Sequence, residues 1–206
     1  MSNSEQELEI KVYISDLQAL KGQLEALGAR LVKSRVHEHN LRFDTTDGEL
    51  TNTAQVLRLR QDTAAKLTYK GPGEMVDGIR SRKEIEFTIS DFNAARNFFE
   101  ALGYQVSVIY EKYRTTYDFE GVEVALDEMP YGDFAEIEGP DPDAINAVAD
   151  KLSINRSASI ADSYTVLFER LRVVLGFTFR DLTFDNFENF EVTPAALGVT
   201  PADQNE

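Results

Sequence analysis

The chain has 206 residues, 42% hydrophobic and 28% charged, so it can bury the core of one domain with an appendage, or of two small domains. Its net charge of −15 argues against a nucleic-acid binder with a broad basic surface, and the lack of cysteine excludes disulfides and thiolate metal sites. The sequence contains no run of about 18 apolar residues and no secretory leader, which predicts a cytoplasmic protein without membrane contact.

An E-x-E segment followed by an amphipathic helix occurs three times, beginning at residues 7, 84 and 136. The first two copies match closely, because their caps repeat at a constant offset of 75 residues. This regularity predicts an internal duplication with a weaker third copy. The expected N-caps are Ser15, Ser90 and either Asp141 or Asp143, and the glycines expected after the first two helices are Gly28 and Gly103.

The segments between the helices have the alternating pattern of strands. Residues 56–61 and 66–70 flank a short polar turn, and residues 71–78 are expected to form a loop. Residues 110–119 and 122–129 predict a hairpin. About eight strands result, enough to close a barrel.

The C-terminal part divides from the rest near residue 176. Residues 1–175 are expected to form the main domain, ending in a helix that begins after residue 162. Residues 176–206 form an aromatic and acidic extension that we expect to pack on the barrel or on a partner, which leaves a homodimer open. The last residues, 200–206, are expected to be disordered.

Charged side chains recur at every second position of nearly every predicted strand, opposite apolar ones. An open sheet with its charged face in water is one interpretation. The alternative is an α+β fold: a closed eight-stranded antiparallel β-barrel, or tunnel, with a polar lumen and helices packed outside. The positions on the charged face are Glu7, Glu9, Lys11, Arg58, Arg60, Lys66, Lys70, Arg82, Glu84, Glu86, Lys112, Arg114, Asp127, Glu136 and Glu138.

A barrel with so many inward charges needs a ligand, since desolvated charges without partners cost several kcal/mol each. Carboxylates suit Mg²⁺ or Mn²⁺, whereas Arg and Lys suit phosphate oxygens. A polyphosphate bound with a divalent metal therefore matches this lumen best.

The motifs resemble those of the CYTH, or triphosphate tunnel metalloenzyme, superfamily, and are most similar to its class IV adenylate cyclase branch. The resemblance extends from residue 5 to about 170. Where many cyclase-like members have Y-F-D, this chain has Leu41-Arg42-Phe43-Asp44. The segments that carry the resemblance, in the order of the family, are E-L-E-I-K (7–11), L-R-L-R (57–60), L-T-Y-K-G-P (67–72), R-x-E-x-E (82–86), E-K-Y-R (111–114), L-D (126–127) and F-A-E-I-E (134–138).

The resemblance implies roles for individual residues. The substrate-binding cations would be Lys11, Arg58, Arg60, Lys66, Lys70, Arg82, Lys112 and Arg114. The metal would be held by Glu7, Glu9, Asp127, Glu136 and Glu138. Glu84 and Glu86 would have a supporting role, either positioning cations or binding metal. Lys11 and Glu9 are the candidates for catalysis.

The same residues would serve two reactions, so the sequence leaves the chemistry open. A cyclase would convert ATP to cyclic AMP and pyrophosphate, whereas a hydrolase would cleave tripolyphosphate, thiamine triphosphate or a nucleoside triphosphate. A non-catalytic binding module is a third hypothesis. His37 and His39 share a strand face but have no evident third metal ligand. Most tyrosines of 104–117 and the phenylalanines of 177–190 are expected to pack outside the barrel.

Overall fold

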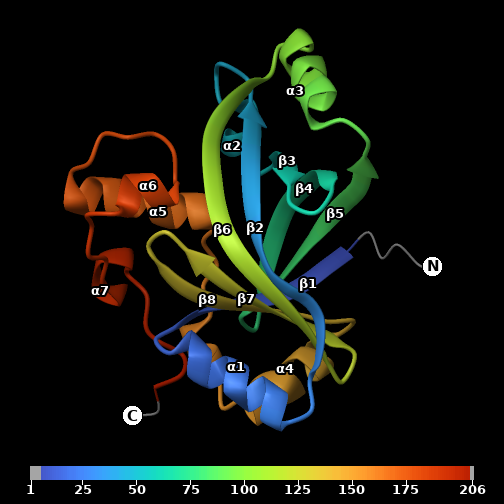
Figure 1. The fold of residues 1–206 in the computed structure, drawn as a ribbon, viewed down its shortest axis with the longest axis vertical. Helices are drawn as coiled ribbons and strands as arrows, with labels where there is room; N and C mark the ends of the chain where they lie inside the picture. The colour runs from blue at the N-terminus through green and yellow to red at the C-terminus, as the bar shows by residue number, and fades with distance from the viewer. Residues whose placement is uncertain (1–5, 205–206) are drawn as a thin grey trace.

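The structure, a computed structural model, describes residues 6–204. This part of the chain forms eight antiparallel strands and the helices that cover them (Figure 1). Within these residues, no helix is long and apolar enough to cross a membrane. The strands are β1 (Gln6–Ile14), β2 (Arg30–Asp44), β3 (Val56–Gln61), β4 (Ala65–Val76), β5 (Ile79–Ile89), β6 (Gln105–Phe119), β7 (Val122–Met129) and β8 (Gly132–Glu138). The helices are α1 (Leu17–Ala26), α2 (Glu49–Asn52), α3 (Phe92–Ala101), α4 (Pro142–Lys151), η1 (Arg156–Ala158), α5 (Tyr164–Leu175), α6 (Phe184–Phe187) and α7 (Pro194–Leu197).

The sheet closes on itself. The strand order is β1-β5-β4-β3-β2-β6-β7-β8, and β8 pairs with β1 to complete a barrel. The two repeated units lie next to each other, because β1 and β5, each the first strand of a unit, pair directly. The strand order and the antiparallel pairing therefore match the closed barrel expected from the sequence.

Two apolar clusters cover the outside of the barrel. Helices α1 and α4 pack together on the outward side chains of β1, β7 and β8, at the lower end in Figure 1. Helix α3 covers β2 and β3 at the upper end through Phe99, which packs against Phe43 in one cluster with the buried Leu41 and Leu59. The strands alternate, so these outward apolar residues force their neighbours to point inward.

The helix caps lie one residue later than the sequence suggested in the two close repeats. Asp16 and Asp91, rather than Ser15 and Ser90, accept hydrogen bonds from the backbone N–H three residues on, each at 2.9 Å. A carboxylate at an N-cap also interacts favourably with the helix dipole. The third copy is capped by Asp141, one of the two residues proposed.

The loop expected over residues 71–78 is wrong, because β4 continues to Val76 and β5 begins at Ile79. The strand register shifts between Lys70 and Gly73, which is a bulge. A bulge accommodates Pro72, which has no N–H to donate to the ladder. The turn lies instead at Asp77 and Gly78, both with positive φ.

The C-terminal extension packs on the barrel together with α5, on the left in Figure 1. Phe177 and Phe179 stack with ring centroids 4.0 Å apart, and Phe187 packs against both rings. Disorder was expected for residues 200–206, but residues 201–204 are placed against the end of β1. The carboxylate of Asp203 accepts hydrogen bonds from the backbone N–H groups of Ser15 and Asp16, which follow β1. Residues 205–206 lie outside the described part of the chain.

Candidate active site

A cavity of about 620 Å³ is lined by side chains of all eight strands and by the start of α5. Ten of the lining residues are Lys or Arg and seven are Glu. Every site residue proposed from the sequence lines this cavity except Asp127. The charged lining residues are Glu7, Glu9, Lys11, Arg42, Arg58, Arg60, Lys66, Lys70, Arg80, Arg82, Glu84, Glu86, Lys112, Arg114, Glu123, Glu136 and Glu138.

Glu7 on β1 is the centre of one group of ion pairs. Its carboxylate lies 2.7 Å from Lys70 Nζ on β4 and 2.7 Å from Arg82 Nε on β5. Lys70 also contacts Glu84 at 2.8 Å, and Arg82 contacts Glu9 at 3.1 Å. Burial raises the pKa of Glu7, but the charges of Lys70 and Arg82 outweigh it and lower the pKa to about 2. These cations are therefore held in place before any ligand binds.

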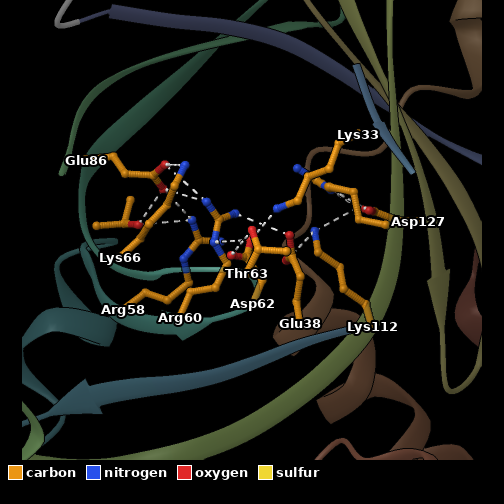
Figure 2. Close-up of polar contacts among 12 residues, drawn as sticks. Lys33, Glu38, Arg58, Arg60, Asp62, Thr63, Lys66, Glu86, Lys112 and Asp127 are labelled. Carbon is orange, nitrogen blue, oxygen red and sulfur yellow. Dashed lines mark hydrogen bonds and ion pairs between the residues drawn. The ribbon is translucent and has the colours of Figure 1, made fainter. Parts of the chain in front are cut away.

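Glu86 on β5 is the centre of a second group (Figure 2). It contacts Lys66 at 2.8 Å, Arg60 at 3.1 Å and Arg58 at 3.3 Å. The hydroxyl of Thr68 donates a fourth bond of 2.8 Å. Burial opposes ionisation of Glu86, but Arg60 and the other cations lower its pKa to about 2. The supporting role proposed for Glu86 is thus to orient three cations of the cavity.

Glu38 on β2 links this group to β6, and sequence reasoning missed it. Its side chain is 1% exposed and lies 3.4 Å from Arg60 and 3.6 Å from Lys112. Burial raises its pKa, but Lys112 and the arginines around it lower the pKa to about 2. Figure 2 shows Glu38 between Arg60 and Lys112. The sequence could have indicated this position, because Glu38 alternates with Asn40 and Arg42 along β2 and the three side chains therefore share one face.

Asp127 on β7 lies behind the cavity lining and is fully buried. It accepts hydrogen bonds from Lys112 at 3.0 Å, from Arg114 at 2.6 Å and from the hydroxyl of Tyr164 at 2.8 Å. Arg114 also pairs with Glu136. Both oxygens of Asp127 are therefore occupied by protein donors, and its evident effect is to aim two cations.

Lys11 on β1 is held from three sides. Its Nζ lies 3.6 Å from Glu136 and donates to the carbonyl of Asp162 at 3.3 Å. The same ammonium lies 4.5 Å from the centre of the Tyr164 ring, a cation–π contact. The start of α5 thus fixes Lys11 within the cavity.

Three carboxylates stand in one row across neighbouring strands. Glu138 on β8 is directly opposite Glu9 on β1 and Glu123 on β7. Burial, together with the negative charges of Glu7 and Glu123, raises the pKa of Glu138 to about 8. Like charges directly opposite in a sheet are destabilising, so this row favours a bound cation. Among residues 6–204, however, no three carboxylate or imidazole groups converge on one preformed metal site.

Four further strand residues with polar or charged side chains line the cavity and were missed: Arg42, Arg80, Tyr110 and Glu123. Tyr110 was not among the proposed site residues, but it alternates with Lys112 and Arg114, and its hydroxyl accepts a hydrogen bond of 3.2 Å from Arg58. Arg80 lies two residues before Arg82 on the same face. By contrast, His37 and His39 both lie near Glu111, at 3.7 and 3.6 Å, and neither lines the cavity.

These features define an α+β protein whose closed barrel carries a densely charged cavity. The chain belongs to the CYTH domain family, which it matches over residues 5–164. A protein of Methanocaldococcus jannaschii, provisionally named an adenylate cyclase, is 35% identical over 135 residues, covering 64% of this chain and 75% of that protein.

Solved structures share the fold. A provisionally named adenylate cyclase of Vibrio parahaemolyticus has a TM-score of 0.72 at 20% identity, with 80% of this chain and 98% of that chain covered. The PH1012 protein of Pyrococcus horikoshii has a TM-score of 0.65 at 24% identity, with coverage of 77% and 96%. The Hippeastrum protein HpAC1, described as an adenylyl cyclase candidate with a dominant triphosphatase activity, has a TM-score of 0.64 at 20% identity, with coverage of 79% and 95%.

Proposed function

We propose that this protein is a metal-dependent enzyme that cleaves a triphosphate bound in the charged cavity. The observation that carries the proposal is the gathering of ten Lys and Arg side chains on one cavity of a chain whose net charge is −15. A cavity of this sign within an acidic protein attracts and concentrates an anion. Its volume of about 620 Å³ suits a small ligand.

Phosphate oxygens would be bound by the cations that the carboxylates hold in position. Phosphoryl transfer depends mainly on placing the substrate and neutralising its charge. The cations that would place the substrate are themselves held in position by carboxylates. Each of four carboxylates forms ion pairs with at least two cations: Glu7, Glu38, Glu86 and Asp127. The proposed phosphate-binding residues are Lys11, Arg58, Arg60, Lys66, Lys70, Arg82, Lys112 and Arg114.

The metal, Mg²⁺ or Mn²⁺, would be held by Glu9 and Glu138, with Glu123, Glu7 and Glu136 close by. Carboxylate oxygens are the ligands that these ions prefer. A divalent cation bound there would also offset the repulsion within the row of Glu9, Glu138 and Glu123. When bound, a divalent ion would neutralise phosphate charge and promote attack on phosphorus. Asp127, proposed from the sequence as a ligand, would instead act by positioning Lys112 and Arg114.

Hydrolysis is the reaction that the lining favours. Beyond its charged residues, the lining comprises only Val56, Ile85, Tyr110, Ser163, Tyr164 and Thr165 among the described residues. The ring of Tyr164 is already engaged by Lys11 and Lys112, so it is not free to stack on a base. A phosphate chain therefore finds more partners here than a nucleoside does, and tripolyphosphate is the expected substrate.

Cyclisation of ATP is the second candidate. It is favoured by the provisional name of the Methanocaldococcus jannaschii relative. In this reaction the same cations would hold the three phosphates, and the ribose 3′-oxygen would replace water as the nucleophile.

Metal and substrate are expected to stabilise the protein together. Each ligand of the folded state raises the melting temperature by mass action, and a metal shared with the phosphates makes each ligand bind more tightly in the presence of the other. Differential scanning fluorimetry with Mg²⁺, tripolyphosphate or both tests this. We expect the combined shift to exceed the sum of the separate shifts. No shift with any of the three would contradict the proposed function.

Stabilisation by Mg²⁺ should increase with pH. The pKa of Glu138 is about 8 in the folded protein, whereas an unfolded glutamate titrates near pH ~4.3. Without metal, the folded state therefore keeps a proton that the unfolded state has lost, and stability falls as pH rises between these values. Mg²⁺ must displace that proton, so its thermal shift is expected to be larger at pH 9 than at pH 6. The Glu138→Gln variant should abolish this difference; an equal shift at both pH values in the wild type would refute the assignment.

A further inference from the structure

Two arginines in the cavity have no carboxylate partner. Eight of the ten cations form ion pairs within 4.0 Å with Glu or Asp. Arg42 and Arg80 form none with the residues that the structure describes, although both line the cavity. These two arginines therefore carry positive charge that no carboxylate of the described chain offsets within 4.0 Å.

Arg42 lies on β2 and is opposite another cation, Arg58, on β3. The one hydrogen bond that its guanidinium makes within the described residues goes to a neutral group, the hydroxyl of Thr165 on α5. Burial, together with the positive charges of Arg58 and Arg82, lowers its pKa despite the nearby Tyr110 and Asp44. Asp44 cannot compensate it directly, because its oxygens accept bonds from the backbone of residues 45, 50 and 51.

Arg80 lies on β5, directly opposite Glu9 in register. Its Nε is buried and makes no hydrogen bond within the described residues. Burial and the charge of Arg82 lower its pKa, while Glu9, Glu7 and Asp162 oppose this from a distance. Unlike Arg82, which has two carboxylates within 3.1 Å, Arg80 is left without a close counter-charge.

Both arginines belong to the surroundings of one segment, residues 162–165 at the start of α5. Arg42 donates a hydrogen bond to Thr165, and both arginines line the cavity together with residues 163–165. The same segment holds Lys11 through the carbonyl of Asp162.

We propose that Arg42 and Arg80 are specificity-determining residues that bind one phosphoryl group of the substrate and select a triphosphate over a diphosphate. The proposal rests on the proposed function of the cavity. An uncompensated, partly buried guanidinium destabilises the empty protein, and a bound phosphate removes that cost. A diphosphate has one phosphoryl group fewer, and we expect its two groups to bind the eight cations that are paired with carboxylates. Arg42 and Arg80 would therefore add less to its affinity than to that of a triphosphate.

The test combines ligand binding with the stability of the empty protein. The variants are Arg42→Gln, Arg80→Gln and a control, Arg30→Gln, whose surface pair with Asp118 lies outside the cavity. Calorimetry measures binding of the non-hydrolysable imido analogues of tripolyphosphate and pyrophosphate in Mg²⁺. We expect each cavity variant to lose about 10- to 100-fold in triphosphate affinity, the range for a charged hydrogen bond, and less for the diphosphate. The control should bind both as the wild type does.

The melting temperature without ligand separates a ligand-binding role from a structural one. Removing an unneutralised charge should raise it in Arg42→Gln and Arg80→Gln, whereas an arginine that stabilises the fold would lower it on substitution. Unchanged triphosphate affinity in both variants would overturn the inference about Arg42 and Arg80 but not the proposed function. Absence of binding to the wild-type protein contradicts the proposed function as well.

Discussion

Replacing Asp127 by Asn is expected to destabilise the protein by about 3–5 kcal/mol, the cost of breaking a buried ion pair. The side chain is fully buried and holds Lys112 and Arg114, both themselves largely buried. Without the carboxylate, two neighbouring cations would repel each other in a region from which water is excluded. For a chain of this length, the loss corresponds to a fall of roughly 6–20 °C in melting temperature.

Urea unfolding followed by circular dichroism measures this change, with Asp118→Asn as the control. Asp118 also pairs with an arginine on a neighbouring strand, but that Arg30 side chain is 69% exposed. The control should unfold at the wild-type urea concentration. If Asp127→Asn were as stable as the control, Asp127 would not be the anchor of these cations, and its assignment to metal binding would regain support.

Replacing Glu9 by Gln is expected to reduce metal-dependent turnover by about 100- to 1,000-fold while the protein stays folded. Stabilisation by a divalent ion is worth several kcal/mol in such reactions, and each ~1.4 kcal/mol is a factor of ten. Glu9 is 4% exposed and lies beside Glu138 in the carboxylate row. The fold should tolerate the change, because Arg82 keeps Glu7 as its partner at 2.7 Å.

Steady-state release of orthophosphate from tripolyphosphate measures the effect over a range of Mg²⁺ concentrations. Glu120→Gln is the matched control, since Glu120 lies in the β6–β7 turn and pairs with the surface Lys151. We expect wild-type rates for the control. A Glu9→Gln variant with wild-type turnover and wild-type dependence on Mg²⁺ would remove Glu9 from the metal site.

The alternation of charged and apolar residues was sufficient to predict which side chains point inward. It works because a strand has a period of two, and helices cover the apolar face of most strands, although Ile85 and Phe87 on β5 are left exposed. Lys112 and Arg114 on β6 illustrate the rule, and so does Glu86 on β5. Tyr110 obeys the same rule but was not proposed for the site, because packing outside the barrel was expected for most tyrosines of residues 104–117.

The partners of each charge could not be predicted in this way. Glu7 meets Lys70 and Arg82 only because β1 pairs with β5 and β5 with β4, a register set by strand closure. The full burial of Asp127 depends on Tyr164, which arrives on α5 from 37 residues further along the chain. Such contacts depend on tertiary packing, of which local sequence carries no trace.

The bulge in β4 and the order of the chain end escaped prediction for related reasons. Gly71-Pro72-Gly73 has the composition of a loop, yet the register shift lets the strand continue through it. Residues 200–206 are mostly polar, but the backbone of Ala202 bonds to Tyr13 at 2.9 Å and to Asn155 at 2.9 Å. A long-range backbone contact outweighs a composition that is typical of disorder.

The most direct test of the account is phosphorus NMR of the purified protein with Mg²⁺, following tripolyphosphate and ATP in separate samples. We expect the tripolyphosphate resonances to give way to orthophosphate and pyrophosphate, faster than ATP is lost, and only while the metal is present. Pyrophosphate formed from ATP together with cyclic AMP would establish the cyclase instead. Unchanged spectra of both compounds over many hours would contradict the claim that this cavity cleaves a triphosphate.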